Sequence, residues 1–377
     1  MSLPNSSTFS SKARTPTPIY DSVRTVIWTI FWLVAFDVLI NFAFAYPPDP
    51  KVTNPSRFQS YFDYGRSTEA KLARMTRPDK SQTAPITLSG WYNPLRVDEQ
   101  GSANNPIVTI YGMSHAVRLG LAITRVSTEF STRIVGAPGA TTNWAYGAYL
   151  RDHGGGKSSV VVLAFMSANF PMITTMSPMT WNIDAPIPYT ADRFVLNNGK
   201  LVVNSPPYMS FEQYVQTFYD RAKWDASLDA FAQHDSMYNA LIMKSSLFDH
   251  SSLYRLVRRA YGQRFLRNAN GAVLSQAGFR PDAEQVKVAQ AMIHEFAMRA
   301  REDKMVPLIF LVNNLGYSDY LFQALRPALE KDNVPYLSSH QVVSPDDPRA
   351  YLPDSHFTDE VDDRLARALI AIIKSHT

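Results

Sequence analysis

The chain carries the side chains of a serine-based acyl-transfer site, spread over separate segments. Ser114, in the sequence GMSH, follows a short β-type run and opens a predicted helix, while Asp354 and His356 stand just before the last predicted helix. A serine hydroxyl attacks a carbonyl when an imidazole accepts its proton, and a neighbouring carboxylate fixes the imidazole tautomer. Ser114, His356 and Asp354 are therefore the candidate nucleophile, base and orienting carboxylate. Each motif also has a plainer explanation, because Ser, Asp and Thr are favoured helix caps.

Two further loops can supply donors for the negative charge that develops on the attacked carbonyl. Gly139, in PGATT, follows the second predicted strand, and glycine lets a backbone amide approach a ligand closely. Asn169, in SAN, follows the third predicted strand. The backbone N–H of Ser114, at a helix N-terminus, is another candidate donor. Taken singly, each loop is equally well explained as a turn or a helix cap.

Strands and helices are predicted to alternate around these residues. Strand-type runs lie at 107–111, 132–135, 159–166, 306–312 and 335–337, and helical patterns at 115–130, 143–150, 281–301, 320–331 and 358–375. This alternation predicts right-handed βαβ units and a parallel sheet. The carboxyl ends of parallel strands meet at one edge, so we expect the candidate residues to converge there.

Residues 170–280 interrupt the alternation and are interpreted as an insertion on the loop side of the sheet. They are expected to hold a hairpin over 194–203 and helices over 210–230 and 236–246. Aromatic residues of the insertion are candidates for a sugar platform, although a place in the local core is the plainer explanation for any one of them: Trp181, Tyr189, Tyr208, Phe211 and Tyr214.

The order of these motifs resembles the SGNH (GDSL-like) hydrolase family over residues 105–377. The resemblance implies a flavodoxin-like three-layer α/β/α sandwich with a central parallel sheet. It also implies that Ser114, Asp354 and His356 are catalytic, and that Ser114, Gly139 and Asn169 form the oxyanion hole. His115 and Met113 are possible pocket residues, and His115 is equally well explained as a first-turn helix residue.

The sequence departs from the usual family pattern at several positions. Met113 stands where the family usually has Asp, Ser167 replaces a Gly, and Phe170 replaces an Asp. The Asp-x-His spacing of Asp354 and His356 is shorter than the common Asp-x-x-His. It is similar to that of membrane-associated members that O-acetylate exopolysaccharides.

The N-terminal region predicts a membrane anchor. A polar tail over 1–24 precedes an apolar run over 25–46, which is long enough to cross a hydrocarbon core of about 30 Å. A connector over 47–104 then leads to the main domain. The alternatives are a long signal peptide, since residues 43–45 read AFA, and a buried soluble helix. Asp37 and Asn41 interrupt the apolar run and are hypothesised to face a partner membrane protein.

Composition excludes several classes of chemistry. The 377 residues include no cysteine, which rules out disulfides, thiol catalysis and cysteine-ligated metals. The histidines lack zinc-ligand spacing, so neither a metal nor a cofactor is expected. A net charge of +4 from scattered basic residues argues against nucleic-acid binding. The run GGGKS at 154–158 precedes a predicted strand instead of following one, so it is not interpreted as a phosphate-binding loop.

Together these patterns predict a single-pass inner-membrane enzyme with its catalytic domain in the periplasm. The expected reaction is acyl, in particular acetyl, transfer or ester hydrolysis on an extracytoplasmic polysaccharide. A membrane-bound O-acyltransferase is the partner implied by the resemblance. The alternative is an inactive scaffold or glycan-binding subunit of an exopolysaccharide complex.

Overall fold

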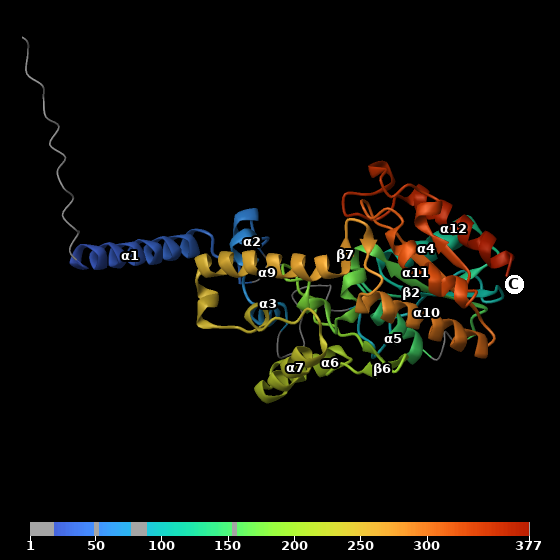
Figure 1. Cartoon of the computed structure of the whole chain (residues 1–377), viewed down its shortest axis with the longest axis horizontal. Helices are drawn as coiled ribbons and strands as arrows, with labels where there is room; N and C mark the ends of the chain where they lie inside the picture. The colour runs from blue at the N-terminus through green and yellow to red at the C-terminus, as the bar shows by residue number, and fades with distance from the viewer. Residues whose placement is uncertain (1–18, 49–52, 77–88, 153–156, 377) are drawn as a thin grey trace, which may run out of the picture.

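The structure, a computed structural model, describes residues 19–48, 53–76, 89–152 and 157–376. Its centre is a six-stranded sheet with the strand order β1-β3-β2-β4-β9-β10 (Figure 1). Five strands run parallel: β2 (Ile107–Gly112), β3 (Ser131–Gly136), β4 (Val160–Met166), β9 (Val306–Val312) and β10 (Tyr336–Ser338). The short β1 (Asp98–Gln100) pairs antiparallel with β3 at the edge. The predicted α/β fold with a central, mostly parallel sheet is confirmed.

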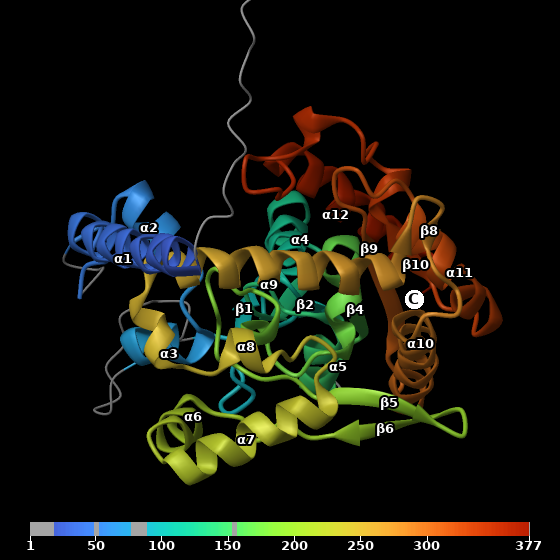
Figure 2. The same ribbon diagram turned by 60° about the vertical axis from the view of Figure 1, so that its left-hand side comes forward.

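Helices cover both faces of this sheet (Figure 2). One face carries α4 (Ser114–Val126) and α12 (Asp359–Lys374), and the other carries α5 (Thr142–Arg151), α10 (Glu284–Glu302) and α11 (Tyr320–Lys331). This covering explains why β4, with the sequence VVVLAFM, is apolar throughout and buried at every position before Met166. A strand buried on both faces needs a continuous apolar run instead of an alternating one.

Neighbouring strands end level with one another at the carboxyl edge. Gly112 of β2 lies beside Gly136 of β3, and Met166 of β4 lies beside Val312 of β9. The segments that follow β2, β3 and β4 therefore begin at the same edge, which is where parallel α/β sheets place their ligand sites.

The N-terminal helix α1 (Ile19–Ala43) projects from the rest of the molecule (Figure 1). Its segment Asp21–Ala43 is long and apolar enough to cross a membrane, and most of it is exposed. The two polar side chains inside it have partners in the same chain. Asp37 Oδ1 accepts the backbone N–H of Leu253 at 2.8 Å, and Asn41 Oδ1 accepts a bond from Arg255 Nη2 at 2.7 Å. A separate membrane protein as their partner stays a prediction.

The helix that receives these contacts, α9 (Ser252–Val273), is absent from the sequence-based prediction. Its 22 residues form a long rod beside two short connector helices, α2 (Arg57–Asp63) and α3 (Thr68–Met75). The backbones of α9 and the connector come into direct contact, because a Cβ on Gly65 would lie 1.6 Å from the carbonyl oxygen of Arg255. The connector is thus packed against the domain.

Several predicted element boundaries are wrong. Residues 89–92 form no strand, and the rest of the strand predicted near 86–92 lies outside the described residues. The first helix predicted in the insertion divides at Asp220, which caps α7 (Arg221–His234) after α6 (Phe211–Phe218). The second shrinks to α8 (Ala240–Met243). Helix α10 begins at Glu284, so Pro281 precedes it. The hairpin is confirmed as β5 (Arg193–Asn197) and β6 (Lys200–Asn204).

Most of the insertion's aromatic residues belong to the core. Tyr189, Tyr208 and Tyr214 are fully buried in the same apolar cluster as the sheet, and Tyr214 stacks on Trp91 at 5.7 Å between ring centroids. Burial of such large rings stabilises the packing of the insertion against the sheet domain. These three tyrosines are not a sugar platform. Trp181 and Phe211 remain half-buried.

Candidate active site

Ser114 sits at a tight turn between β2 and α4. The strand ends at Gly112, Met113 adopts an extended conformation, and the helix begins at Ser114. Gly112 allows this turn to pack closely, because a Cβ there would lie 2.7 Å from the methyl groups of both Ala116 and Ala164. The hydroxyl of Ser114 is thereby presented at the carboxyl edge, and its N–H belongs to a helix N-terminus. Met113 is fully buried in the core.

His356 contacts Ser114 directly although 242 residues separate them. Its Nε2 lies 2.6 Å from Ser114 Oγ, and its Nδ1 lies 3.0 Å from Asp354 Oδ2. Asp354 also accepts the backbone N–H of His356 at 3.2 Å. The structure therefore brings the three predicted triad residues together in the order hydroxyl, imidazole, carboxylate.

A tight turn holds Asp354 and His356 in this arrangement. Ser355 between them has a φ of +68°, a left-handed conformation that is uncommon for residues other than glycine. The N–H of Leu352 donates to the carbonyl of His356 at 2.7 Å, which closes the turn. Hydrogen bonds from the side chain and backbone of His356 lower the pKa of the Asp354 carboxyl. The Asp354 side chain is nevertheless 66% exposed, so water screens its charge.

His115 forms a neutral platform under the base. Its ring stacks on that of His356 with centroids 4.8 Å apart, and its Nε2 lies 3.3 Å from the carbonyl oxygen of Ser355. Burial, followed by repulsion from His356, lowers the pKa of His115 to about 4. An uncharged ring at this position does not compete for the proton that His356 would accept. His115 thus belongs to the site through its contact with the base.

Arg118, which sequence reasoning missed, joins the helix of the serine to the segment of the histidine. It lies one helical turn after Ser114 and donates to the carbonyl of Phe357 at 3.0 Å. Its Nε donates to Asp362 Oδ2 at 2.7 Å and its Nη2 to Asp359 Oδ1 at 2.8 Å. The i, i+4 spacing from Ser114 was the available signal, since residues four apart share a helix face.

The loop of Gly139 is held from two sides. Tyr189 donates to the carbonyl of Pro138 at 2.9 Å, and the Asn169 amide donates to the carbonyl of Ala140 at 2.7 Å. Gly139 between them has a φ of +66°. A Cβ on Gly139 would lie 3.9 Å from Trp181, which places this half-buried aromatic of the insertion beside the loop. Gly139 and Asn169 are therefore linked through Ala140, while their role as oxyanion donors stays a prediction.

Ser167, at the position where the family usually has glycine, anchors the end of β4 to the end of β9. Its Oγ accepts the N–H of Asn314 at 2.9 Å and donates to Asn314 Oδ1 at 3.1 Å. The same Oδ1 accepts the N–H of Ala168 at 3.0 Å. These bonds fix the segment that carries Asn169. Asn314 was missed because its role depends on a contact across 147 residues.

Within the described ranges, no group of three or more His, Asp or Glu side chains is placed to hold a metal ion. Part of the GGGKS run lies outside those ranges. Comparison with protein-family models, with curated proteins and with solved structures found no significant match to this chain.

Proposed function

We propose that this protein transfers an acyl group through a serine acyl-enzyme. The observation that carries the proposal is the continuous contact from Ser114 Oγ to His356 Nε2 at 2.6 Å and from His356 Nδ1 to Asp354 at 3.0 Å. A hydroxyl bonded to an imidazole that is itself oriented by a carboxylate is the arrangement that activates a serine.

The proposed reaction has two halves. Ser114 Oγ attacks the ester carbonyl while His356 Nε2 takes the hydroxyl proton, and the tetrahedral intermediate then collapses. The ester C–O bond breaks, and the leaving alcohol receives the proton from His356. Water or a second hydroxyl next attacks the acyl-enzyme, gives its proton to His356, and releases Ser114 with the proton returned to its oxygen.

The negative charge of the intermediate is assigned to the N–H groups of Ser114 and Gly139 and the amide of Asn169. One such donor contributes about 2.7–4 kcal/mol to the transition state. Asn169 has two amide hydrogens, and its bond to Ala140 uses one of them. The second is available for this role.

The strand order supports assignment to the SGNH hydrolase class. Numbered along the chain, the five parallel strands follow the order 2-1-3-4-5, which is the order of flavodoxin-like folds. Ser114, Gly139 and Asn169 follow the first, second and third of these strands, and His356 precedes the last helix. This is the sequence of motifs on which the resemblance rests.

The proposed substrate is an acyl ester of a sugar, or a sugar hydroxyl as acceptor, on a polysaccharide outside the cytoplasm. Three features support it: the Asp-x-His spacing, the apolar helix α1, and Trp181 beside the Gly139 loop, since aromatic faces pack well against sugar rings. On this proposal α1 anchors the domain on the periplasmic face of the inner membrane. A membrane-bound O-acyltransferase would supply or share the acyl group, an inference by analogy.

The test measures hydrolysis of an aryl acetate by the full chain and by Ser114→Ala. We expect the substitution to lower kcat/KM by roughly 10⁴- to 10⁶-fold, because the covalent route is lost. Ser375→Ala, at the exposed end of α12, is the matched control and should leave the rate unchanged.

Product analysis with a polysaccharide acceptor then separates the two outcomes of the acyl-enzyme. An acetylated glycan identifies a transferase, and free acetate alone identifies an esterase. Turnover that survives in Ser114→Ala would contradict the proposal. A wild-type chain that is inactive with every acceptor would favour the scaffold alternative.

A further inference from the structure

The end of the molecule next to α1 exposes large apolar side chains. Leu247 is 87% exposed and Phe248 61% exposed, in the short helix η5 (Leu247–His250) that precedes α9. Phe42 near the end of α1 and Phe58 on α2 are exposed to a similar degree. We name these four residues the apical patch. Figure 1 shows that α2 and the beginning of α9 lie at the end of α1, so the patch surrounds that end.

Hydrogen bonds place η5 and α9 at a definite level along α1. Asp37 accepts the N–H of Leu253, the second residue of α9, at 2.8 Å. Asp37 lies six residues before the end of α1 at Ala43, which corresponds to about 9 Å along a helix axis. The beginning of α9 therefore lies alongside the apolar segment and below its end.

The length of α1 leaves little freedom to shift this level out of a membrane. The segment Asp21–Ala43 has 23 residues and is about 34 Å long, against a hydrocarbon core of about 30 Å. Excluding Asp37 and everything after it would leave 16 residues, or about 24 Å, which is too short to span. A helix that spans must carry Asp37, and with it Leu253, into the membrane.

The polar groups at this level are satisfied inside the protein. The positive end of the α9 dipole faces the Asp37 carboxylate, which favours the negative charge there. Arg255 is buried, donates to Asn41 and Ser252, and lies 3.7 Å from Asp63. These contacts remove the cost of placing Asp37 and Asn41 in an apolar segment. What remains on the outside is apolar.

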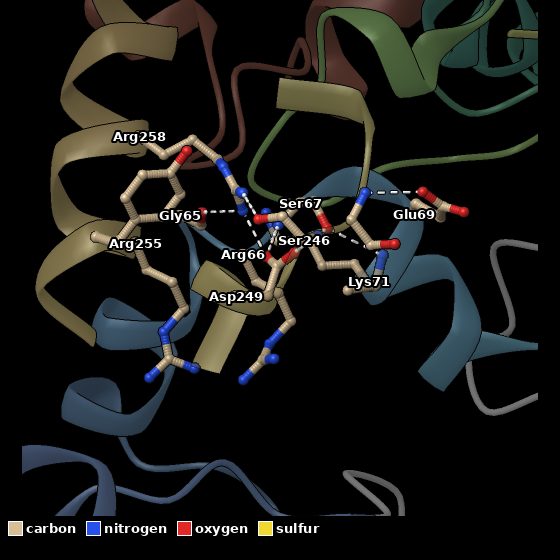
Figure 3. Close-up of polar contacts among 12 residues, drawn as sticks. Gly65, Arg66, Ser67, Glu69, Lys71, Ser246, Asp249, Arg255 and Arg258 are labelled. Atoms are coloured by element: carbon tan, nitrogen blue, oxygen red, sulfur yellow. Dashed lines mark hydrogen bonds and ion pairs between the residues drawn. The ribbon is translucent and has the colours of Figure 1, made fainter. Parts of the chain in front are cut away.

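A buried polar cluster holds η5 in its outward position (Figure 3). Asp249 accepts the N–H of Ser67 at 2.7 Å and the N–H of Ser246 at 2.8 Å, and it pairs with Arg258. Glu69 accepts the N–H of Ser245 at 2.7 Å. Leu247 and Phe248 lie between the bonded residues Ser246 and Asp249, so the backbone is fixed at both ends and the two side chains point away from the domain.

We infer that the apical patch enters the same lipid bilayer that α1 crosses, with Leu247 and Phe248 as a second, non-spanning membrane contact. Lipid is favoured over a protein partner because the hydrogen bonds to α1 continue the spanning surface directly into the patch. Aromatic residues beside a spanning helix are typical of the membrane interface. This inference does not depend on the chemistry at Ser114.

The absence of cysteine from the chain gives a direct test. Single variants Leu247→Cys and Phe248→Cys of the full chain carry an environment-sensitive fluorophore and are reconstituted into phosphatidylcholine nanodiscs with or without doxyl-labelled lipid. Val38→Cys on α1 reports the span, and Leu196→Cys, an exposed position on β5, is the control distant from the membrane. Retained aryl acetate turnover, or an unchanged Tm if that turnover is absent, verifies that each variant is folded.

We expect doxyl lipid to quench the fluorophore at positions 38, 247 and 248 but not at 196, and aqueous iodide to quench only the last. Quenching at 38 with water exposure at 247 and 248 would overturn the inference. So would shielding at 247 that appears only after a second membrane protein is added. Loss of quenching at 38 would remove the span and the inference together.

Discussion

Two carboxylates, Asp354 at the candidate active site and Asp249 at the junction with α1, are built in opposite ways. The side chain of Asp249 is 5% exposed and accepts bonds from Ser67, Ser246 and Arg258. Asp354 is 66% exposed and has His356 as its bonded partner. Burial raises the pKa of Asp249, but the bonds from Ser67, Ser246 and Arg258 outweigh it and leave that pKa below its usual value.

The difference separates a group that holds structure from a group that assists a reaction. Asp249 has its hydrogen-bonding capacity filled, so its contacts have no part in a reaction cycle. Asp354 keeps the capacity to stabilise a positive charge that would appear on His356 only during turnover. The same substitution at the two positions should therefore produce opposite results.

The largest effect on stability is expected for Asp249→Asn. The neutral amide leaves the Arg258 cation, 3% exposed, without a compensating charge, and breaking a buried pair in this way costs about 3–5 kcal/mol. Thermal unfolding of the detergent-solubilised chain should show a clearly lower Tm, while kcat/KM per folded molecule stays the same. Asp347→Asn, at an exposed ion pair, is the control that should leave Tm unchanged. An unaltered Tm for Asp249→Asn would remove the structural side of the comparison.

Asp354→Asn should leave Tm unchanged and lower kcat/KM by about 10²- to 10³-fold. The loss is smaller than the roughly 10⁴-fold cost of the same change in a buried triad, because water screens this exposed carboxylate. Aryl acetate hydrolysis measured against Ser114→Ala sets the scale. A rate equal to that of the wild-type chain would exclude Asp354 as the orienting carboxylate.

A smaller effect, which depends on pH, is expected at His115. Its pKa in the folded protein is about 4, below the unfolded value near 6.5, so the unfolded chain binds more protons between these values. The stability of the wild-type chain therefore falls as pH drops from about 6.5 towards 4, by up to about 3 kcal/mol. His115→Phe keeps a flat ring but cannot titrate, so its Tm should fall less on acidification from pH 7 to pH 4.5. Parallel Tm curves for the two proteins would show that His115 is not the titrating group.

Much of the sheet domain could be predicted because its signals are local. β4 announces itself by a continuous apolar run, and α12 by its amphipathic spacing. Asp354 and His356 stand two residues apart, so their pairing needs no knowledge of the fold. The contact of His356 with Ser114 was predictable only through the rule that parallel strands end at a common edge.

The elements that were missed depend on distant partners. Helix α9 contains arginines at buried positions, and its pattern reads as polar until Arg255 and Arg258 are matched with Asp63 and Asp249. Its Gly262 reads as a helix breaker, although a Cβ there would lie 2.8 Å from Ile183. Strand β1, with the sequence DEQ, has no apolar signal at all. No window of the sequence alone contains these pairings.

The uninterrupted course of α9 has a consequence for reach. Its 22 residues rise about 33 Å, from the contact with Asp37 to the hairpin of β7 (Leu274–Ser275) and β8 (Gly278–Phe279). Phe279 of that hairpin packs on Phe170, the neighbour of Asn169, at 4.7 Å. With η5 in the bilayer, α9 acts as a ruler that sets the standoff between lipid and catalytic edge by residue count. One residue more would lift that edge by about 1.5 Å and turn it by about 100°, so the glycan must rise to the enzyme.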